Sequence, residues 1–219
     1  LDSVGVEPIA DPMLAVEPTG VLPRSDAAVV VFTSKTGVEL VEGRWSPGDA
    51  TVCAIGETTA EALRDAGYGV DIVPREYTSS GLVEALRDRV DGERVEIARS
   101  DHGSAALPDG LWDAGAYVHE TVLYRLSRPE SAGESVHLAA EGALDAVLFT
   151  SSLTVEYFMD IAEAQAIEDA VIDGLSAAVV GVIGEPTRET ACNRGISADV
   201  VSEVADFEVL ARSVAERLD

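Results

Sequence analysis

The stretch VVFTS at residues 30–34 returns as VLFTS at residues 147–151, and this repetition decides the fold. A second pair agrees with it, because AIGETTAEA at residues 54–62 returns as VIGEPTRET at residues 182–190. Each segment contains a predicted strand followed by a turn and the start of a helix, and these form the repeating unit of a parallel α/β sheet. The sequence therefore predicts two similar parallel-sheet α/β domains with a ligand cleft between them.

The spacing of the repeats indicates where the two halves differ in length. The first pair of segments is 117 positions apart and the second pair 128, an offset that Gly67 and Gly195 share. The later half should therefore contain about 11 extra residues, which we expect within residues 159–173. A period of this length excludes a solenoid of short repeats and favours domain duplication.

The order of the expected elements predicts that one domain is discontinuous. A strand at Val6–Ile9 follows the end of a helix and is too short to form a domain, so we assign it to the C-terminal half. Two connectors, Met13–Pro18 and Tyr124–Arg128, would form a two-stranded β connector. The predicted parts are residues 1–18 with the opening strand and first connector, residues 19–124 as the middle domain, and residues 125–219 with the second connector and the remainder of the discontinuous domain.

Other elements follow from apolar periodicity. We expect strands at Gly69–Val73 and Ala198–Val201, a helix over most of Val155–Ile172, and helices that end at Gly67 and Gly195. The chain opens with Leu1 in the middle of this pattern, which predicts an N-terminal truncation.

The charge of the chain is strongly acidic. The 219 residues include 40 acidic and 15 basic side chains, of which Lys35 is the only lysine, and the net charge is −25. This composition favours a surface adapted to high salt, and the alternative is a strongly basic partner. Nucleic acid is excluded because phosphate binding needs a basic surface. An anionic substrate would have to be bound by backbone amides and a few arginines.

The cysteines and histidines predict no metal centre. Cys53 and Cys192 are not spaced as metal ligands, and the three histidines form no ligand set. We expect two buried free thiols, which favour a reducing cytoplasm. No apolar run reaches membrane-spanning length, so we expect no membrane partner. The sequence does not point to oligomers, and we expect a monomer.

Hydroxyl-rich turns follow the predicted strands, where open parallel sheets bind ligands. Their amides point outward at helix starts and suit carboxylates. The same hydroxyls could simply cap the helices, with Thr58 and Glu61 as a capping box, and both readings stay open. The candidate binding residues are Thr33, Ser34, Lys35, Thr36, Thr58, Thr59, Ser79, Ser80, Ser151, Ser152 and Thr187.

Tyr124 stands at the end of a predicted long strand, on the second connector. A tyrosine at such a position often serves in packing. A phenol can also donate a proton or a hydrogen bond to a leaving hydroxyl group. The position alone does not choose between the two roles.

Taken together, these segments resemble the uroporphyrinogen-III synthase family over almost the whole chain. The matching segments are FTS at 32–34, IGETTAEAL at 55–63 with Gly67, YTSS at 77–80, ETVLYR at 120–125, FTS at 149–151 and IGEPT at 183–187. Each segment alone is weak, and their order and spacing together are specific. The acidic, lysine-poor composition resembles a halophilic archaeal member of that family.

The resemblance implies a fold and a reaction. The fold is two α/β domains joined by a two-stranded β ladder, with the start of the chain completing the C-terminal domain. The reaction is the cyclisation of a linear tetrapyrrole, hydroxymethylbilane, with loss of water and inversion of ring D, and it uses no metal or organic cofactor. Tyr124 matches the tyrosine proposed to assist departure of the hydroxyl group. Arg99 aligns with a position that is often basic, and the hydroxyl-rich turns would bind substrate carboxylates through backbone amides.

Two other classes of function remain as alternatives to the enzyme. A non-catalytic two-domain module would bind a small molecule or regulate without chemistry, and Tyr124→Phe would then barely change its affinity. A scaffold protein would have no need of duplicated hydroxyl-rich turns at the strand ends.

Overall fold

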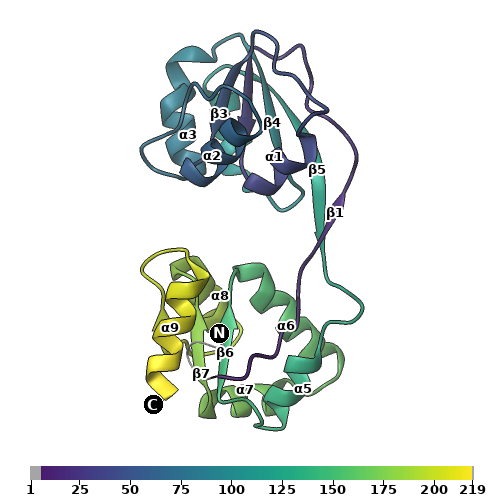
Figure 1. The fold of residues 1–219 in the computed structure, drawn as a ribbon, viewed down its shortest axis with the longest axis vertical. Helices are drawn as coiled ribbons and strands as arrows, with labels where there is room; N and C mark the ends of the chain where they lie inside the picture. The colour runs from purple at the N-terminus through teal and green to yellow at the C-terminus, as the bar shows by residue number, and fades with distance from the viewer. Residues whose placement is uncertain (1–5, 219) are drawn as a thin grey trace. The chain divides into compact units, whose positions relative to one another are not determined.

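The computed structural model describes residues 6–218, which form two compact units (Figure 1). One unit comprises Val16–Ser127, and the other comprises Leu1–Ala15 together with Arg128–Asp219. The chain thus enters the continuous unit once and leaves it once. The predicted domain limits, after residues 18 and 124, each differ by three residues from these unit boundaries.

The Val16–Ser127 unit is built on a five-stranded sheet with the order β1-β5-β4-β2-β3. The strands are β1 (Ala15–Pro18), β2 (Val29–Phe32), β3 (Thr51–Ala54), β4 (Arg94–Ser100) and β5 (Tyr117–Ser127). Strand β2 pairs in parallel with both β3 and β4, and β4 pairs in parallel with β5. Because these four strands run the same way, their carboxyl ends lie at one edge of the sheet.

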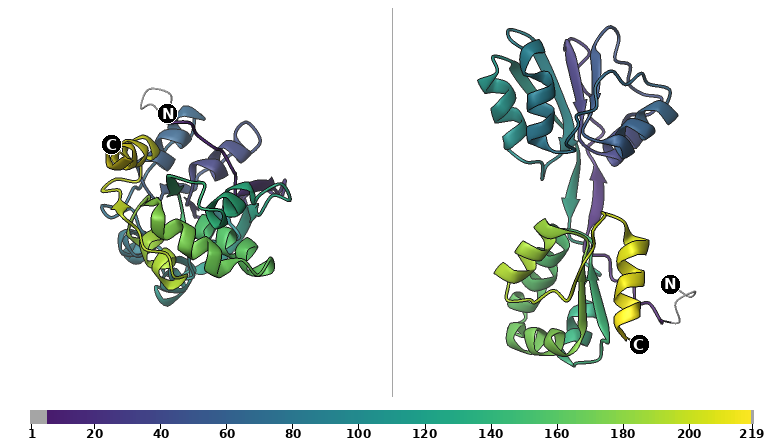
Figure 2. Two further views of the ribbon diagram at one scale, coloured as in Figure 1. Left: turned by 90° about the horizontal axis from the view of Figure 1, so that it is seen from below. Right: turned by 90° about the vertical axis from the view of Figure 1, so that its left-hand side faces the viewer.

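Helices cover both faces of this sheet (Figure 2). Val30 and Phe32 of β2 pack in a core with α1 (Lys35–Val41) and α2 (Glu57–Asp65). Val29 and Val31 point the opposite way and pack with α3 (Ser79–Leu86) and α4 (Ala106–Asp113). All four residues of β2 are therefore buried, as expected for a central parallel strand. A short 3-10 helix, η2 (Arg87–Arg89), follows α3.

The second unit contains a three-stranded parallel sheet with the order β6-β7-β8. Its strands are β6 (Ala146–Phe149), β7 (Val179–Val182) and β8 (Val200–Val201). Its helices are α5 (Glu134–Ala140), α6 (Ser152–Ala164), α7 (Glu168–Ala177), α8 (Glu185–Asn193) and α9 (Phe207–Leu218). Helices α5 to α8 contribute to one core with Phe149, Val180 and Val182.

Helix α9 packs on the other face of this sheet, over Gly181. A Cβ at Gly181 would lie 2.5 Å from Val214 Cγ2 and 3.1 Å from Leu210 Cδ1, so the glycine permits the close approach of the helix. The two α/β units predicted from the repeats are thus present, with sheets of unequal size.

The expected strand at Val6–Ile9 is wrong, because these residues adopt no regular structure. The opening segment is attached instead by side chains. Met13 is buried in the core of the second unit, and the Asp11 carboxylate accepts hydrogen bonds from the amides of Gly133 and Ser135, at 3.1 and 2.8 Å. Asp11 thereby caps the start of α5, a helix that the apolar pattern did not predict. The expected helix end at residues 1–5 lies outside the described residues.

Three other expectations also need correction. Gly69–Val73 is not a strand, since Ile72 forms only an isolated bridge with Cys53. The helix expected over Val155–Ile172 is divided into α6 and α7, because Ala166 adopts a left-handed conformation with φ of 54°. The expected strand at Ala198–Val201 shortens to β8. Both predicted helix-ending glycines, Gly67 and Gly195, have positive φ, at 83° and 81°.

Candidate functional site

The first candidate turn links β2 to α1 in the Val16–Ser127 unit. Ser34 is the N-cap of α1, and its Oγ accepts a hydrogen bond from the Gly37 amide at 3.0 Å. The capping role is therefore confirmed for this serine. The exposed Lys35 forms an i,i+4 ion pair with Glu39 at 3.5 Å, so its charge is partly balanced within its own helix. Thr33 and Thr36 are half-buried in the same turn.

Tyr124 reaches this turn because of an irregularity in β5. Arg99 lies opposite Val122 and Ser100 opposite Tyr124, so β5 carries one extra residue at this point. Such a bulge re-aims the side chains next to it. Here Leu123 and Tyr124, although consecutive, both belong to the core that α1 and α2 cover.

The phenol of Tyr124 is 7% exposed and donates a hydrogen bond to Ser34 Oγ at 3.0 Å. Two predicted site residues that are 90 positions apart are thus in direct contact. The packing role of Tyr124 is present, and so is a hydrogen bond that connects its hydroxyl group with the turn at the strand ends. The same side chain can therefore pack in the core and donate a hydrogen bond to the turn.

The turn between β3 and α2 differs from the expectation. Gly56 is the N-cap of α2, so Thr58 lies inside the helix and forms no capping box with Glu61. Gly184 occupies the same position before α8, with Pro186 in the first turn, so the two copies have the same register. A backbone N-cap needs no hydroxyl group, and the hydroxyl of Thr58 is free to face solvent. Thr59 is buried, at 5% exposure.

The turn before α3 contributes a residue that the sequence reading did not select. Thr78 is the N-cap of α3 and accepts the Gly81 amide at 3.0 Å, so Ser79 and Ser80 form the first helical positions. Tyr77 is 61% exposed, and its ring lies over the Gly56 backbone, where an added Cβ would be 3.1 Å from Tyr77 Cγ. The ring therefore connects the starts of α2 and α3. The signal was an aromatic residue directly before a capping threonine.

Arg99, which the resemblance aligns with an often basic position, is not a free cation. Its guanidinium forms an ion pair with Glu120, and its Nη1 donates a hydrogen bond to the Ser104 carbonyl at 2.7 Å. The side chain is 12% exposed and packs under the loop at Gly103. Its charge is therefore locally neutralised, and its contacts hold the loop that follows β4.

In the second unit, Ser151 is the N-cap of α6 and forms a capping box with Thr154. The Ser152 hydroxyl donates a hydrogen bond to the Pro186 carbonyl at 3.1 Å and so brings the starts of α6 and α8 together. Thr187 is 3% exposed. Its hydroxyl group is therefore shielded from solvent, whereas the first amides of α8 have no intrahelical acceptor. This unit has turns equivalent to the first two, and no described counterpart of the contact between Tyr124 and Ser34.

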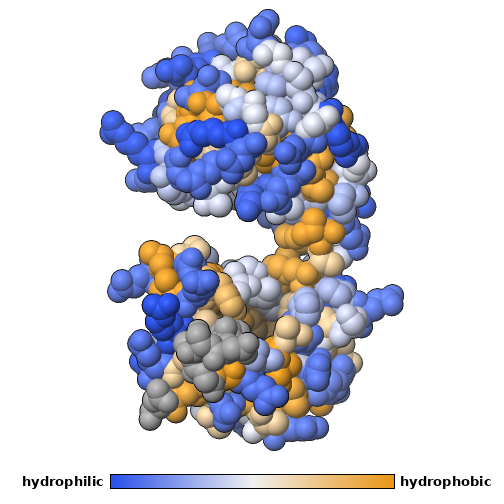
Figure 3. Space-filling model, viewed as in Figure 1, coloured by the Kyte–Doolittle hydropathy of each residue, from blue (hydrophilic) through white to orange (hydrophobic). Residues whose placement is uncertain are grey.

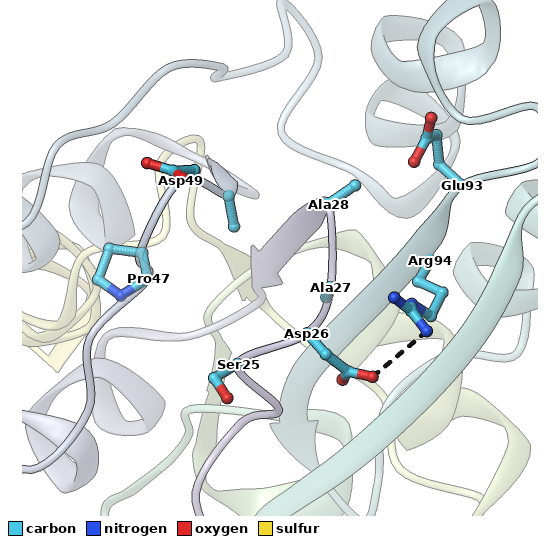
Figure 4. Close-up of a pocket in the computed structure, with 9 residues that line it drawn as sticks. Ser25, Asp26, Ala27, Ala28, Pro47, Asp49, Glu93 and Arg94 are labelled. Carbon is cyan, nitrogen blue, oxygen red and sulfur yellow. Dashed lines mark ion pairs between the residues drawn. The ribbon is translucent and has the colours of Figure 1, made fainter.

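A cavity lies at the opposite end of the first sheet (Figure 4). It has a volume of about 410 Å³ and adjoins the starts of β2, β3 and β4, lined in part by Asp26, Asp49 and Glu93. Arg94 pairs with Asp26 at 3.5 Å, and Arg24 pairs with the same carboxylate at 3.0 Å. Three carboxylates make this cavity unsuitable for a polyanion, and it contains none of the predicted site residues.

Several simple alternatives find no support in residues 6–218. No cluster of histidine, cysteine and carboxylate side chains suitable for a metal ion occurs there. No helix among these residues is long and apolar enough to cross a bilayer. Both cysteines are free, but only Cys53 is buried, and the expected burial of Cys192 is wrong because it lies on the exposed side of α8.

Comparison with known proteins places the chain among tetrapyrrole enzymes. The family model described as HEM4, uroporphyrinogen-III synthase HemD, matches residues 1–212. A candidate uroporphyrinogen-III synthase of Methanothermobacter thermautotrophicus is 35% identical over 181 residues, which cover 78% of this chain and 70% of that protein. The uroporphyrinogen-III synthase of Synechococcus elongatus is 28% identical over 163 residues, or 69% of this chain and 62% of that protein.

Solved structures agree at the level of the fold. A mutant uroporphyrinogen III synthase from the extremely thermophilic bacterium Thermus thermophilus matches with a TM-score of 0.70 at 17% identity, covering 99% of this chain and 91% of that chain. The uroporphyrinogen-III synthetase of Helicobacter pylori matches with a TM-score of 0.68 at 16% identity, covering 94% and 91%. The two-domain α/β fold class inferred from the repeats is thereby confirmed.

Proposed function

The chain belongs to the uroporphyrinogen-III synthase family, and from this premise we propose that it cyclises hydroxymethylbilane to uroporphyrinogen III. The reaction removes water and inverts ring D. The observation that carries this proposal is the family match over residues 1–212. The contact between Tyr124 and Ser34 supports it, because a phenol lies where the resemblance expects a group that assists loss of a hydroxyl.

The chemistry places two demands on the protein. The substrate loses its terminal hydroxyl group as water to form an azafulvenium cation, and ring D then attacks at its substituted carbon to give a spiro intermediate. This intermediate fragments and closes again as the type III isomer. Because the linear substrate closes without a catalyst to the type I isomer, the protein must assist the loss of water and also hold the chain in one conformation.

We assign the first demand to Tyr124. A hydroxide is a poor leaving group, and a proton delivered to the leaving oxygen converts it to water. Tyr124 lies level with the carboxyl end of β4 and at the turn that begins α1. Its burial keeps the phenol in one orientation, which is what a positioned proton donor requires.

We assign the second demand to the turns that follow the strands. A helix start leaves its first amides without an intrahelical acceptor, and these amides bind carboxylates well. The proposed contacts in the first unit are the amides and hydroxyls of Thr33, Ser34, Lys35, Thr36, Thr58, Thr59, Ser79 and Ser80. Those in the second unit are Ser151, Ser152 and Thr187. Arg99 takes part by holding the loop after β4 in place.

The charge supports a finer proposal about the setting of the enzyme. A net charge of −25 with one lysine is typical of a protein from a salt-rich cytoplasm, and we propose a halophilic, monomeric enzyme. The two free cysteines are compatible with a reducing compartment. The same charge opposes binding to nucleic acid or to an anionic membrane surface.

The test is the isomer ratio of the product. Protein is incubated with freshly prepared hydroxymethylbilane in molar KCl, and the type III and type I products are separated after oxidation. We expect type III to predominate, while a blank without protein gives type I. A ratio equal to that of the blank would remove the enzyme, and substrate binding without a change in ratio would favour a non-catalytic binding module.

A further inference from the structure

We propose that Ser34 carries the proton from the Tyr124 phenol to the leaving hydroxyl group, so that the two side chains act as a relay. This inference rests on the proposed function and assigns Ser34 a chemical role beyond capping α1. Ser34 would then be the residue that touches the substrate, whereas Tyr124 would act through it. The proposal follows from the hydrogen bonds of Ser34, the burial of Tyr124 and the fit of Gly37.

The hydrogen bonds of Ser34 fix the direction of its own proton. Its Oγ accepts one hydrogen bond from the Gly37 amide and one from the Tyr124 hydroxyl, each at 3.0 Å. A serine hydroxyl has two acceptor lone pairs and one proton to donate. With both lone pairs engaged by neighbours inside the fold, the Ser34 proton has to point away from them.

Burial separates the roles of the two groups. Tyr124 is 7% exposed, so direct contact between its phenol and a large substrate is restricted. Ser34 is less buried and lies in the turn at the carboxyl ends of the strands. A proton that leaves Tyr124 toward the substrate side therefore passes through Ser34 Oγ, which is its hydrogen-bond acceptor.

Close packing keeps the pair in this geometry. A Cβ at Gly37 would lie 3.2 Å from Ser34 Oγ and 3.2 Å from Leu123 Cδ1, so the start of α1 packs tightly against Ser34 and β5. The bulge in β5 places Leu123 and Tyr124 against the same core.

The relay balances in protons and electrons. The C–O bond of the hydroxymethyl group breaks as the Ser34 proton moves to the leaving oxygen, which departs as water. Ser34 Oγ takes the Tyr124 proton in the same step, and the electron pair of the adjacent pyrrole forms the azafulvenium cation. Tyr124 is left as a phenolate, and it regains a proton by the reverse route when the later ring closure releases one. No oxidant, reductant or metal ion is required.

The decisive variant is Ser34→Asn, because asparagine retains a good N-cap acceptor and cannot pass a proton as a hydroxyl group does. We expect it to lower kcat by about 10²-fold, within the usual contribution of general acid catalysis. Tyr124→Phe should lower kcat to a similar extent while keeping the aromatic packing. Ser34→Thr keeps both the cap and the hydroxyl, and it should restore most of the activity.

Two readouts distinguish a relay from a structural role. In single-turnover reactions, the double variant Ser34→Asn/Tyr124→Phe should be no slower than either single variant, because members of one relay are not additive. A proton inventory in mixtures of light and heavy water should show two transferred protons for the wild type and one for Tyr124→Phe. Asp206→Ala is the matched control for cap loss, since Asp206 accepts the Val209 amide at the start of α9, at 3.0 Å.

The outcomes separate this inference from the proposed function. Wild-type protein that gives only the type I product would remove the function and the relay together. Active wild type with full activity in folded Ser34→Asn would remove the relay alone. Multiplicative losses in the double variant would also overturn it, because they would show that the two hydroxyl groups act independently.

Discussion

Cys53 and Cys192 differ sharply at the level of single residues. Burial raises the pKa of the Cys53 thiol to about 12, and the nearby Asp71 carboxylate contributes in the same direction. Since the thiolate is the reactive form, Cys53 should be inert at neutral pH. We expect a thiol reagent at pH 8 to modify one cysteine of the native protein, Cys192, as measured by absorbance or mass spectrometry.

The control for this prediction is Cys192→Ser, which should show no modification until denaturant is added. Rapid modification of the native Cys192→Ser protein would contradict the burial of Cys53, a β3 residue, in the core beneath α3 and α4. The sequence gives no reason to expect different burial for the two cysteines, because neither has a counterpart in the other half. The position of Cys192 on the polar face of α8 distinguishes them.

Glu96 is a buried residue that no sequence pattern singles out, because acidic residues are so frequent in this chain. It is 0% exposed in β4, where its carboxylate accepts hydrogen bonds from Thr121 and from His119 Nδ1, the latter at 2.7 Å. A buried carboxylate needs such partners because an unpaired one is costly. Parallel register places Glu96 beside His119, and no spacing in the sequence encodes that pairing.

The sequence indicates candidate positions for the site, and it does not reveal their contacts. Ser34 and Tyr124 were each selected from the sequence, yet their hydrogen bond depends on a one-residue bulge in β5 that no composition reveals. Arg99 shows the opposite case. The resemblance aligned it with a position that is often basic, but Glu120 on the neighbouring strand pairs with its charge.

At the level of secondary-structure elements, two aspartate side chains accept hydrogen bonds from strand amides. The Asp71 carboxylate accepts the Val52 amide of β3 at 2.8 Å, and the Asp199 carboxylate, directly before β8, accepts the Val180 amide of β7 at 2.9 Å. The two aspartates are 128 positions apart, which is the repeat offset. In each sheet a side chain thus takes the place of a strand carbonyl.

We expect Asp71→Ala and Asp199→Ala each to destabilise its own unit by about 1–3 kcal/mol, because a backbone amide of a strand loses its acceptor. Asp71→Asn retains an acceptor oxygen and should recover part of the loss. Urea unfolding followed by circular dichroism measures the effect, and exposed Asp88→Ala serves as the control. Equal stabilities of Asp71→Ala and the control would show that water replaces the carboxylate at no cost.

Element types were predictable wherever apolar periodicity was strong. The buried strand β2 and the helix ends at Gly67 and Gly195 follow from composition and turn chemistry. The expected Val6–Ile9 strand failed because its apolar residues lack a partner strand and the segment is anchored by Asp11 and Met13. Alternating side chains predict a strand only where a ladder is available to receive it.

The charge is a property of the whole molecule, and polar side chains are widespread over the visible surface of each unit (Figure 3). A net charge of −25 repels itself at low salt and destabilises the compact state. The screening length falls from about 10 Å at 0.1 M to about 3 Å at 1 M salt. The midpoint of thermal unfolding should therefore rise as KCl increases over this range.

The same charge predicts an unusual salt dependence of substrate binding. An enzyme that binds a polyanion through a basic surface loses affinity as salt increases, whereas here most of the long-range field is repulsive. Screening should weaken that repulsion more than it weakens amide contacts made at hydrogen-bond distance. We expect KM for hydroxymethylbilane to fall on the order of tenfold between 0.1 and 1 M KCl, in line with the usual size of electrostatic steering. The measurement is made at a temperature where circular dichroism shows the protein fully folded at both concentrations, so that stability does not contribute. A KM that rises steadily with KCl would show that local cations, and not helix-start amides, dominate the attraction for the substrate.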